Sequence, residues 1–166
     1  MKIWQKTNDV SEMEKKDKIT ESILWSIALP GFPKILNGQL LKGILFIILE
    51  LIINVMANFN EAIRLSFIGN IEGAVSQANY HWLMFHPCLY FFAMWDAFKD
   101  AGGGKQPYSY LPFVSSAFFV TVGTIYSAQT KVFGVLLGAV WFPILWVIPG
   151  LIIGFSIKLI LNLKEG

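Results

Sequence analysis

Residues 29–58 read LPGFPKILNGQLLKGILFIILELIINVMAN, and this stretch decides how the rest of the chain folds. The residues that interrupt its first third are Pro30, Gly31, Pro33 and Gly38. Proline and glycine break helices, whereas the leucine- and isoleucine-rich run that follows them favours a helix. The stretch therefore predicts a broken loop that leads into an apolar helix, and the other apolar segments can be placed against it.

The composition of the chain is that of a membrane protein. Of its 166 residues, 55% are hydrophobic and only 14% are charged, and the mean hydropathy is +0.56. Soluble domains contain roughly 45–50% apolar and about 25% charged residues. The formal net charge of +2 is too small to indicate a nucleic-acid partner. The composition predicts the lipid bilayer as a partner, together with other membrane proteins or further copies of this chain.

The charged side chains are concentrated near the N-terminus, since residues 1–21 hold ten of the 24. We predict a charged cytoplasmic tail here, either mobile or partly helical over residues 11–21. Residues 23–29 are apolar but too few to cross a bilayer, which takes about 20 residues of helix. Because Pro30 ends this segment, it is expected to form a short re-entrant or interfacial helix with Trp25 at headgroup depth.

Residues 22–166 are predicted to form a single membrane domain, an all-α helical bundle of about four spans. The polar and apolar residues of 60–79 are mixed, which indicates a helix or loop on the far membrane surface. The last segment has 30 residues, about 45 Å as a helix against a hydrocarbon core of about 30 Å, and is kinked at Pro143 and Pro149. Whether it crosses once or twice stays open. The predicted spans are residues 39–58, 80–98, 111–127 and 132–161.

The distribution of basic residues orients this bundle. If residues 23–29 are re-entrant and the last segment crosses once, 11 of the 13 basic residues fall on one side. Only Arg64 and Lys131 then fall on the other side. Because short cytoplasmic loops carry an excess of lysine and arginine, we expect a multi-pass protein of the cell membrane with both termini in the cytoplasm.

Glu50 lies near the middle of the first predicted span, where a carboxylate costs several kcal/mol unless it is paired or protonated. Helical spacing places Asn54 and Asn58 on the same stripe, with Asn54 one turn from Glu50. One interpretation is a proton or ion relay. The other is a protonated acid that joins helices by hydrogen bonds, and the absence of a second acid deep in a span favours it.

The sequence contains no set of residues with the spacing of a catalytic or metal site. His81, His86 and Cys88 lie close together, but on a helix His86 points away from the other two. We predict no metal, no cofactor and no enzymatic activity.

At the end of the second predicted span, residues 80–98, Asp96 and Lys99 have the i,i+3 spacing of an ion pair that anchors a helix end.

Two Gly-x-x-x-Gly motifs lie in the last segment, and small residues at this spacing let helices approach closely in lipid. The third predicted span has a similar small face that includes Ser116 and Gly123. We expect the motifs to pack helices of the same chain rather than two copies of it. The candidate packing residues are Gly134, Gly138, Gly150 and Gly154.

Pro30-Gly31, Asn37-Gly38 and Lys42-Gly43, followed by an apolar helix, form a pattern that resembles the two-transmembrane-helix hairpin domain family. The resemblance covers roughly residues 23–58 and implies a helical hairpin. Pro33 stands where that pattern usually has glycine, and Leu36 stands where it has an aromatic residue. As a whole, the chain resembles small multi-pass membrane proteins of Gram-positive bacteria, and this resemblance implies no role for any single residue.

These features predict a non-enzymatic membrane protein that serves as a structural or regulatory subunit of a membrane complex. The alternative is an oligomeric transporter or channel component that uses Glu50 with Asn54 and Asn58 as a polar path. A membrane enzyme that acts on lipid through His81 or His86 is a third and more distant possibility.

Overall fold

The chain forms an all-α structure, 78% helical and 3% strand. The structure is a computed structural model, and it describes the backbone of residues 2–165 and the side chains of residues 12–164. In chain order the elements are α1 (Lys2–Ala28), α2 (Phe32–Leu36), α3 (Leu40–Met56), α4 (Phe59–Phe67), α5 (Ile71–Gln77), α6 (Tyr80–Leu83), α7 (Phe85–Asp100), η1 (Gly103–Lys105), α8 (Leu111–Tyr126), β1 (Lys131–Val132), β2 (Val135–Leu136), α9 (Gly138–Leu145) and α10 (Val147–Glu165).

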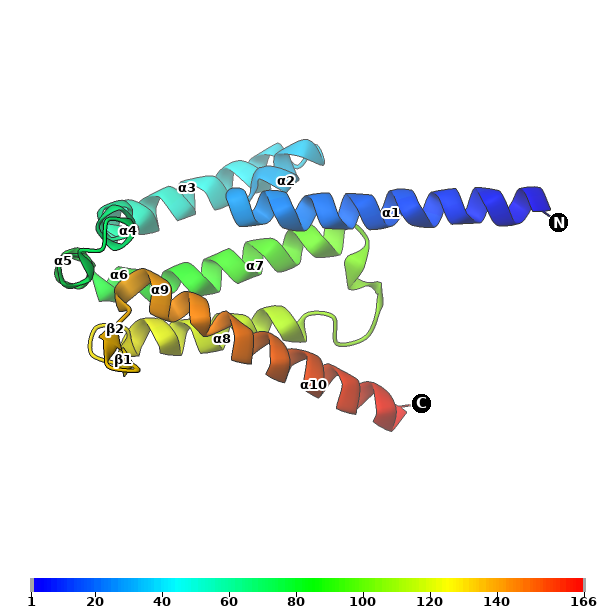
Figure 1. The fold of residues 1–166 in the computed structure, drawn as a ribbon. Coiled ribbons are helices and arrows are strands. Elements are labelled where there is room, and N and C mark those ends of the chain that lie inside the picture. The colour runs from blue at the N-terminus through cyan, green and yellow to red at the C-terminus, as the bar shows by residue number, and fades with distance from the viewer. Residues whose placement is uncertain (1, 166) are drawn as a thin grey trace.

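One helix of 27 residues, α1, takes the place of the predicted tail and the separate short helix. The prediction of a separate short helix over residues 23–29 is wrong in its bounds, because the chain contains no proline or glycine before Pro30 to interrupt α1. Figure 1 shows the first part of α1 projecting beyond the ends of the other helices. The first part of α1 therefore forms a projecting arm, and only the second part of the helix packs on the bundle.

The segment that follows α1 contains the short helix α2, which packs tightly on the start of α3. A Cβ atom on Gly43 would lie 2.6 Å from Cγ1 of Ile35 and 2.9 Å from the backbone oxygen of Gly31. Gly31 itself has φ +93°, a conformation that L side chains rarely adopt. The two glycines thus allow the backbone just before α2 to touch the backbone of α3.

Helix α3 ends at a sharp bend, and α4 leaves it at an angle of 68°. Asn58 forms the bend with φ 53°, a left-handed conformation that asparagine tolerates better than most residues. Its side-chain nitrogen donates to the backbone oxygen of Gln77 at 3.2 Å. Residues 60–79 accordingly form two helices, α4 and α5, at one end of the bundle, while both chain termini lie at the other end (Figure 1).

The second predicted span, residues 80–98, is divided into α6 and α7. The break lies at Met84, three residues before Pro87. Proline lacks the backbone N–H and clashes with the preceding turn, so it is accommodated in the first turn of the new helix. Buried Phe91 and Met94 of α7 pack against Val120 of α8.

The last predicted span begins later than expected, because residues 131–136 form a β-hairpin. Phe133 (φ 49°) and Gly134 (φ 83°) make its two-residue turn, and such turns require positive φ at both positions. After the hairpin, residues Gly138–Lys164 form the one helix within residues 2–165 that is long and apolar enough by itself to cross a membrane. The bent pair of α3 and α4 would make a second candidate if it counts as one span.

The glycines of the two Gly-x-x-x-Gly motifs lie in different kinds of structure. Gly134 lies in the hairpin turn, where an added Cβ would have no neighbour within 4 Å, so the helix face predicted for Gly134 and Gly138 does not exist. Gly138 lies at the start of α9, where a Cβ would lie 2.7 Å from the side chain of Ile71. Gly150 and Gly154 lie where α10 meets α8, and Cβ atoms there would lie 2.7 Å and 2.6 Å from Cα atoms of that helix.

We expect Gly150→Leu to lower the free energy of unfolding by about 1–3 kcal/mol, the usual cost of forcing extra atoms into a packed contact. The cause is the backbone of Ser116, which cannot move aside as a flexible side chain would. Denaturation in detergent micelles measures the effect. Ser156→Leu on the exposed face of α10 is the control and should stay within about 0.5 kcal/mol of the original chain. Equal effects in the two variants would contradict the packing account.

Candidate functional site

The centre of the bundle holds a contact between an acid on α3 and a histidine on α7. Oε1 of Glu50 lies 2.8 Å from Nε2 of His86, and the two side chains are 11% and 19% exposed, respectively. Aromatic rings enclose the imidazole, with Phe59 at a centroid distance of 4.8 Å and Tyr90 stacked on it at 5.5 Å. In such apolar surroundings a direct contact between the two groups is worth much more than on a surface.

Asn54 continues this site one helical turn along α3. Its Oδ1 atom and Oε2 of Glu50 are both buried, and neither has a hydrogen-bond partner in the described part of the chain. A buried acceptor without a donor costs about 1–3 kcal/mol. The polar site, defined here as Glu50, Asn54 and His86, therefore has two oxygen atoms available to one further donor.

The polar site is connected to α1 through Tyr90. The Tyr90 hydroxyl donates to the backbone oxygen of Ile27 at 2.8 Å, close to the last residue of α1. Helix C-termini leave their last carbonyl groups without partners, and this hydroxyl satisfies one of them. The contact fixes the end of α1 beside the middle of α7.

The structure brings together two of the three residues in the predicted polar stripe. Asn58 lies apart from Glu50 at the bend and bonds to Gln77. The sequence interpretation did not pair Glu50 with His86, although an acid and a histidine in otherwise apolar segments are each expected to seek a partner. His81 is exposed, and Sγ of Cys88 lies 3.7 Å from Oγ1 of Thr121. Among the described residues, no group of three or more His, Cys, Asp or Glu side chains could hold a metal ion.

A second set of charges closes the end of the bundle near the chain termini. Lys34 of α2 is fully buried, and its Nζ atom lies 2.5 Å from Oδ2 of Asp96 and also contacts Asp100. Lys42 contacts the same Asp96 carboxylate at 2.6 Å, and Gln39 donates to Asp100 at 2.7 Å. We call these five residues the charge cluster. The cluster ties the α2–α3 hairpin to the end of α7.

The predicted pairing of Asp96 with Lys99 is replaced by this cluster. Asp96 contacts Lys34 and Lys42, whereas Lys99 is exposed. Lysine side chains from the hairpin reach Asp96 because α2 and α3 pack beside the end of α7, a proximity that spacing along one helix cannot reveal. The cluster positions elements and contains no nucleophile paired with a base.

Acid is expected to weaken the charge cluster. Burial by itself raises the pKa of Asp100, but hydrogen bonds from Lys34 and Gln39 outweigh burial and leave the pKa below its usual value. A lowered pKa contributes stability that is complete above the unfolded value of about 3.9 and is lost as the pH falls through the folded value. The unfolding free energy should therefore fall below about pH 4, and less so in Asp100→Asn. An identical acid response in that variant would exclude Asp100 as the cause.

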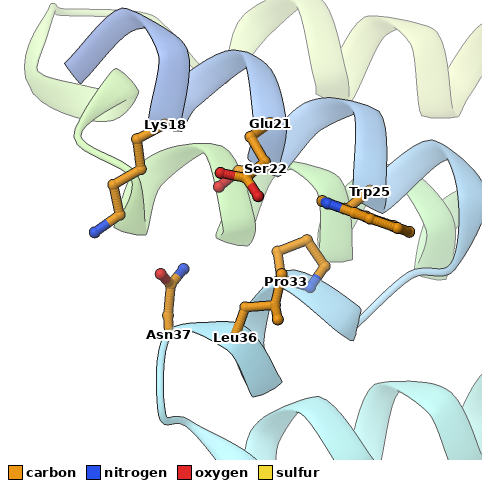
Figure 2. A pocket seen from close by; sticks show the side chains of 7 residues that line it. All are labelled: Lys18, Glu21, Ser22, Trp25, Pro33, Leu36 and Asn37. Carbon is orange, nitrogen blue, oxygen red and sulfur yellow. The ribbon is translucent and has the colours of Figure 1, made fainter. Parts of the chain in front are cut away.

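Two hollows on the surface border α1. The first, about 350 Å³, lies between α1 and α2, and Figure 2 shows Lys18 and Asn37 on opposite sides of one end and Trp25 beside Pro33 at the other. The second, about 560 Å³, is more open and includes Leu24 and Trp25. Charged and apolar side chains thus meet at the base of the arm, an arrangement that suits contact with another molecule more than catalysis.

No protein family, curated protein or solved structure matches the chain. The fold and the two charged sites define a helical protein with a buried acid–histidine pair and a projecting N-terminal helix.

Proposed function

We propose that the chain is a non-enzymatic, multi-pass membrane protein that acts as a structural or regulatory subunit of a larger membrane complex. In this proposal residues 23–58 form a helical hairpin of the kind that their sequence resembles, and only the end of α1, from residue 23 on, is re-entrant or interfacial. Four segments cross the bilayer: α3, residues 80–98 of α6 and α7, α8, and α9 with α10. Both termini lie in the cytoplasm.

The apolar surface of the helices supports the membrane placement. Leu41 of α3 is 88% exposed, Phe118 of α8 is 64% exposed and Ile152 of α10 is 60% exposed. Large apolar side chains exposed on several helices suit a surface that faces lipid. Helix α3 has 17 residues, about 25 Å of length, which is close to the thickness of the hydrocarbon core.

The projecting arm of α1 is the observation that carries the subunit proposal. Met13 and Leu24 on this helix are 64% and 61% exposed, and charged residues flank Met13 along the chain. A long helix with little packing of its own is stabilised by contact with a partner, since intrinsic helix propensity contributes little. The hollow beside Trp25 provides a place for that contact at the base of the arm.

Site-specific photo-cross-linking in native membranes tests the subunit proposal. A cross-linker in place of Met13 should capture one partner in stoichiometric amount, and Trp25→Ala should weaken the capture. The matched control is a cross-linker in place of Phe133, which is fully exposed on the hairpin at the other end of the bundle. A monomeric protein that forms no specific adduct from Met13 would contradict the proposal.

The buried pair of Glu50 and His86 favours a second candidate function, that of an oligomeric transporter or channel component. Ionisable residues inside a membrane commonly mark the path of an ion or proton. If the chain has this function, Glu50→Gln should abolish the flux of ions or protons across the membrane of reconstituted vesicles while the fold is retained. Glu61→Gln on α4 is the control, because the exposed side chain of Glu61 pairs with Arg64 away from the bundle centre. Unchanged flux in Glu50→Gln would remove this candidate.

A further inference from the structure

We propose that the polar site binds one exchangeable proton on Glu50, donated to Asn54, and that the proton enters and leaves at the end of the bundle formed by α4 and α5. The inference deepens the second candidate function and rests on its membrane placement. It names the proton as the species that the site takes up.

The hydrogen-bonding capacity of the polar site indicates where the proton binds. A neutral His86 with its proton on Nε2 donates to Oε1 of Glu50 across 2.8 Å. Oε2 of Glu50 and Oδ1 of Asn54 are both acceptors, so neither can satisfy the other. A proton that bonds to Oε2 turns it into a donor for Asn54, and no other bond breaks. The site then carries no net charge and has partners for both buried oxygens.

The titratable groups on the neighbouring elements, as far as the structure describes them, do not compete with Glu50, Asn54 and His86 for this proton. On α7 the other titratable neighbour is Tyr90, whose hydroxyl is committed to the backbone of Ile27 on α1. From α2, Lys34 is held in the charge cluster. Other titratable groups of the packed elements are engaged or exposed: Glu61 pairs with Arg64 on α4, His81 of α6 is exposed, Tyr80 of α6 contacts Ser127, and Cys88 of α7 contacts Thr121 of α8.

The direction of exchange follows from what lies on each side of Glu50 along α3. Toward α4, the polar side chains of Asn54 and Asn58 follow at successive turns, and Asn58 is exposed beside Gln77. Toward the charge cluster, buried Phe46 takes the corresponding position, with its ring 5.9 Å from that of Phe92. Proton relays inside membranes run along chains of polar and ionisable groups, and packed phenyl rings offer no group that can carry a proton.

Infrared difference spectroscopy of the reconstituted full-length protein measures the proton directly. Between about pH 6 and about pH 9, a range in which exposed carboxyl groups stay ionised, we expect a protonated-carboxyl band that appears and disappears reversibly. The band should be lost in Glu50→Gln, kept in Glu61→Gln, and shifted to higher frequency in Asn54→Leu, which removes the acceptor. No pH-dependent band, as for a permanent ion pair or a site filled by water, would overturn the proposal.

The rate of the response tests the path. After a pH jump, Asn58→Leu should slow the change of the band about tenfold, which corresponds to the net free energy of one hydrogen bond. Lys42→Met at the other end of α3 should leave the rate unchanged. A slowed response in Lys42→Met alone would reverse the assigned direction. A band that titrates in a protein without flux would support the proton site and contradict the transport function. Flux without the band would support the transport function and contradict the proton site.

Discussion

Lys34→Met is expected to cause the largest loss of stability of any single substitution in the charge cluster. Lys34 has no exposed side-chain surface and contacts both Asp96 and Asp100, which are only 14% and 24% exposed. Removal of one partner from a buried ion pair leaves an uncompensated charge and costs about 3–5 kcal/mol. Denaturation of the purified protein in detergent should show a loss of this size.

Lys42→Met is the matched control for this prediction. Lys42 contacts the same Asp96 carboxylate, but its side chain is 44% exposed. Exposed ion pairs contribute about 0–1 kcal/mol, so this variant should unfold nearly as the original chain does. If Lys34→Met were as mild as Lys42→Met, the charge cluster would not hold the α2–α3 hairpin on α7.

The second large effect is expected in a double-mutant cycle at the polar site. Glu50→Leu and His86→Leu alone should each cost about 3–5 kcal/mol, because each leaves the other group buried without its partner. The double variant should be less destabilised than the sum of the two, since apolar replacement of a whole buried pair is often neutral.

The unfolding free energies of the four chains in the same detergent give the coupling between Glu50 and His86. A coupling of about 0.5–3 kcal/mol is expected for side chains in direct contact. Additive losses would mean that the two groups act independently, and the contact of 2.8 Å between them would then contribute nothing to stability.

The sequence predicted the helical class and singled out Glu50 as a lone acid within an apolar segment, because both are local features of the chain. The partners of the charges were not predictable in the same way. Lys34 and the backbone of Asp96 are 62 residues apart, and only the packing of α2 on α3 and of α3 on α7 brings them together. Pairing across helices depends on the whole arrangement, whereas the i,i+3 spacing of Asp96 and Lys99 is visible in one segment.

The predicted role of Gly134 shows a different limit. Gly-x-x-x-Gly indicates close helix packing only where the residues are helical, and residues 131–136 instead form a hairpin. Lys131-Val132 and Val135-Leu136 flank Phe133-Gly134, and β-branched valine on both sides of a turn with glycine is typical of a hairpin. The apolar character of the segment favours a span and masks this turn signal.

Cysteine accessibility in intact cells tests the proposal that the chain crosses the membrane four times with both termini in the cytoplasm. In a Cys88→Ser background, Ser76→Cys places a thiol on α5, and Lys105→Cys places one near the termini. A membrane-impermeant thiol reagent should label Ser76→Cys in intact cells and Lys105→Cys only after permeabilisation. Labelling of Lys105→Cys in intact cells, or protection of Ser76→Cys, would contradict the account.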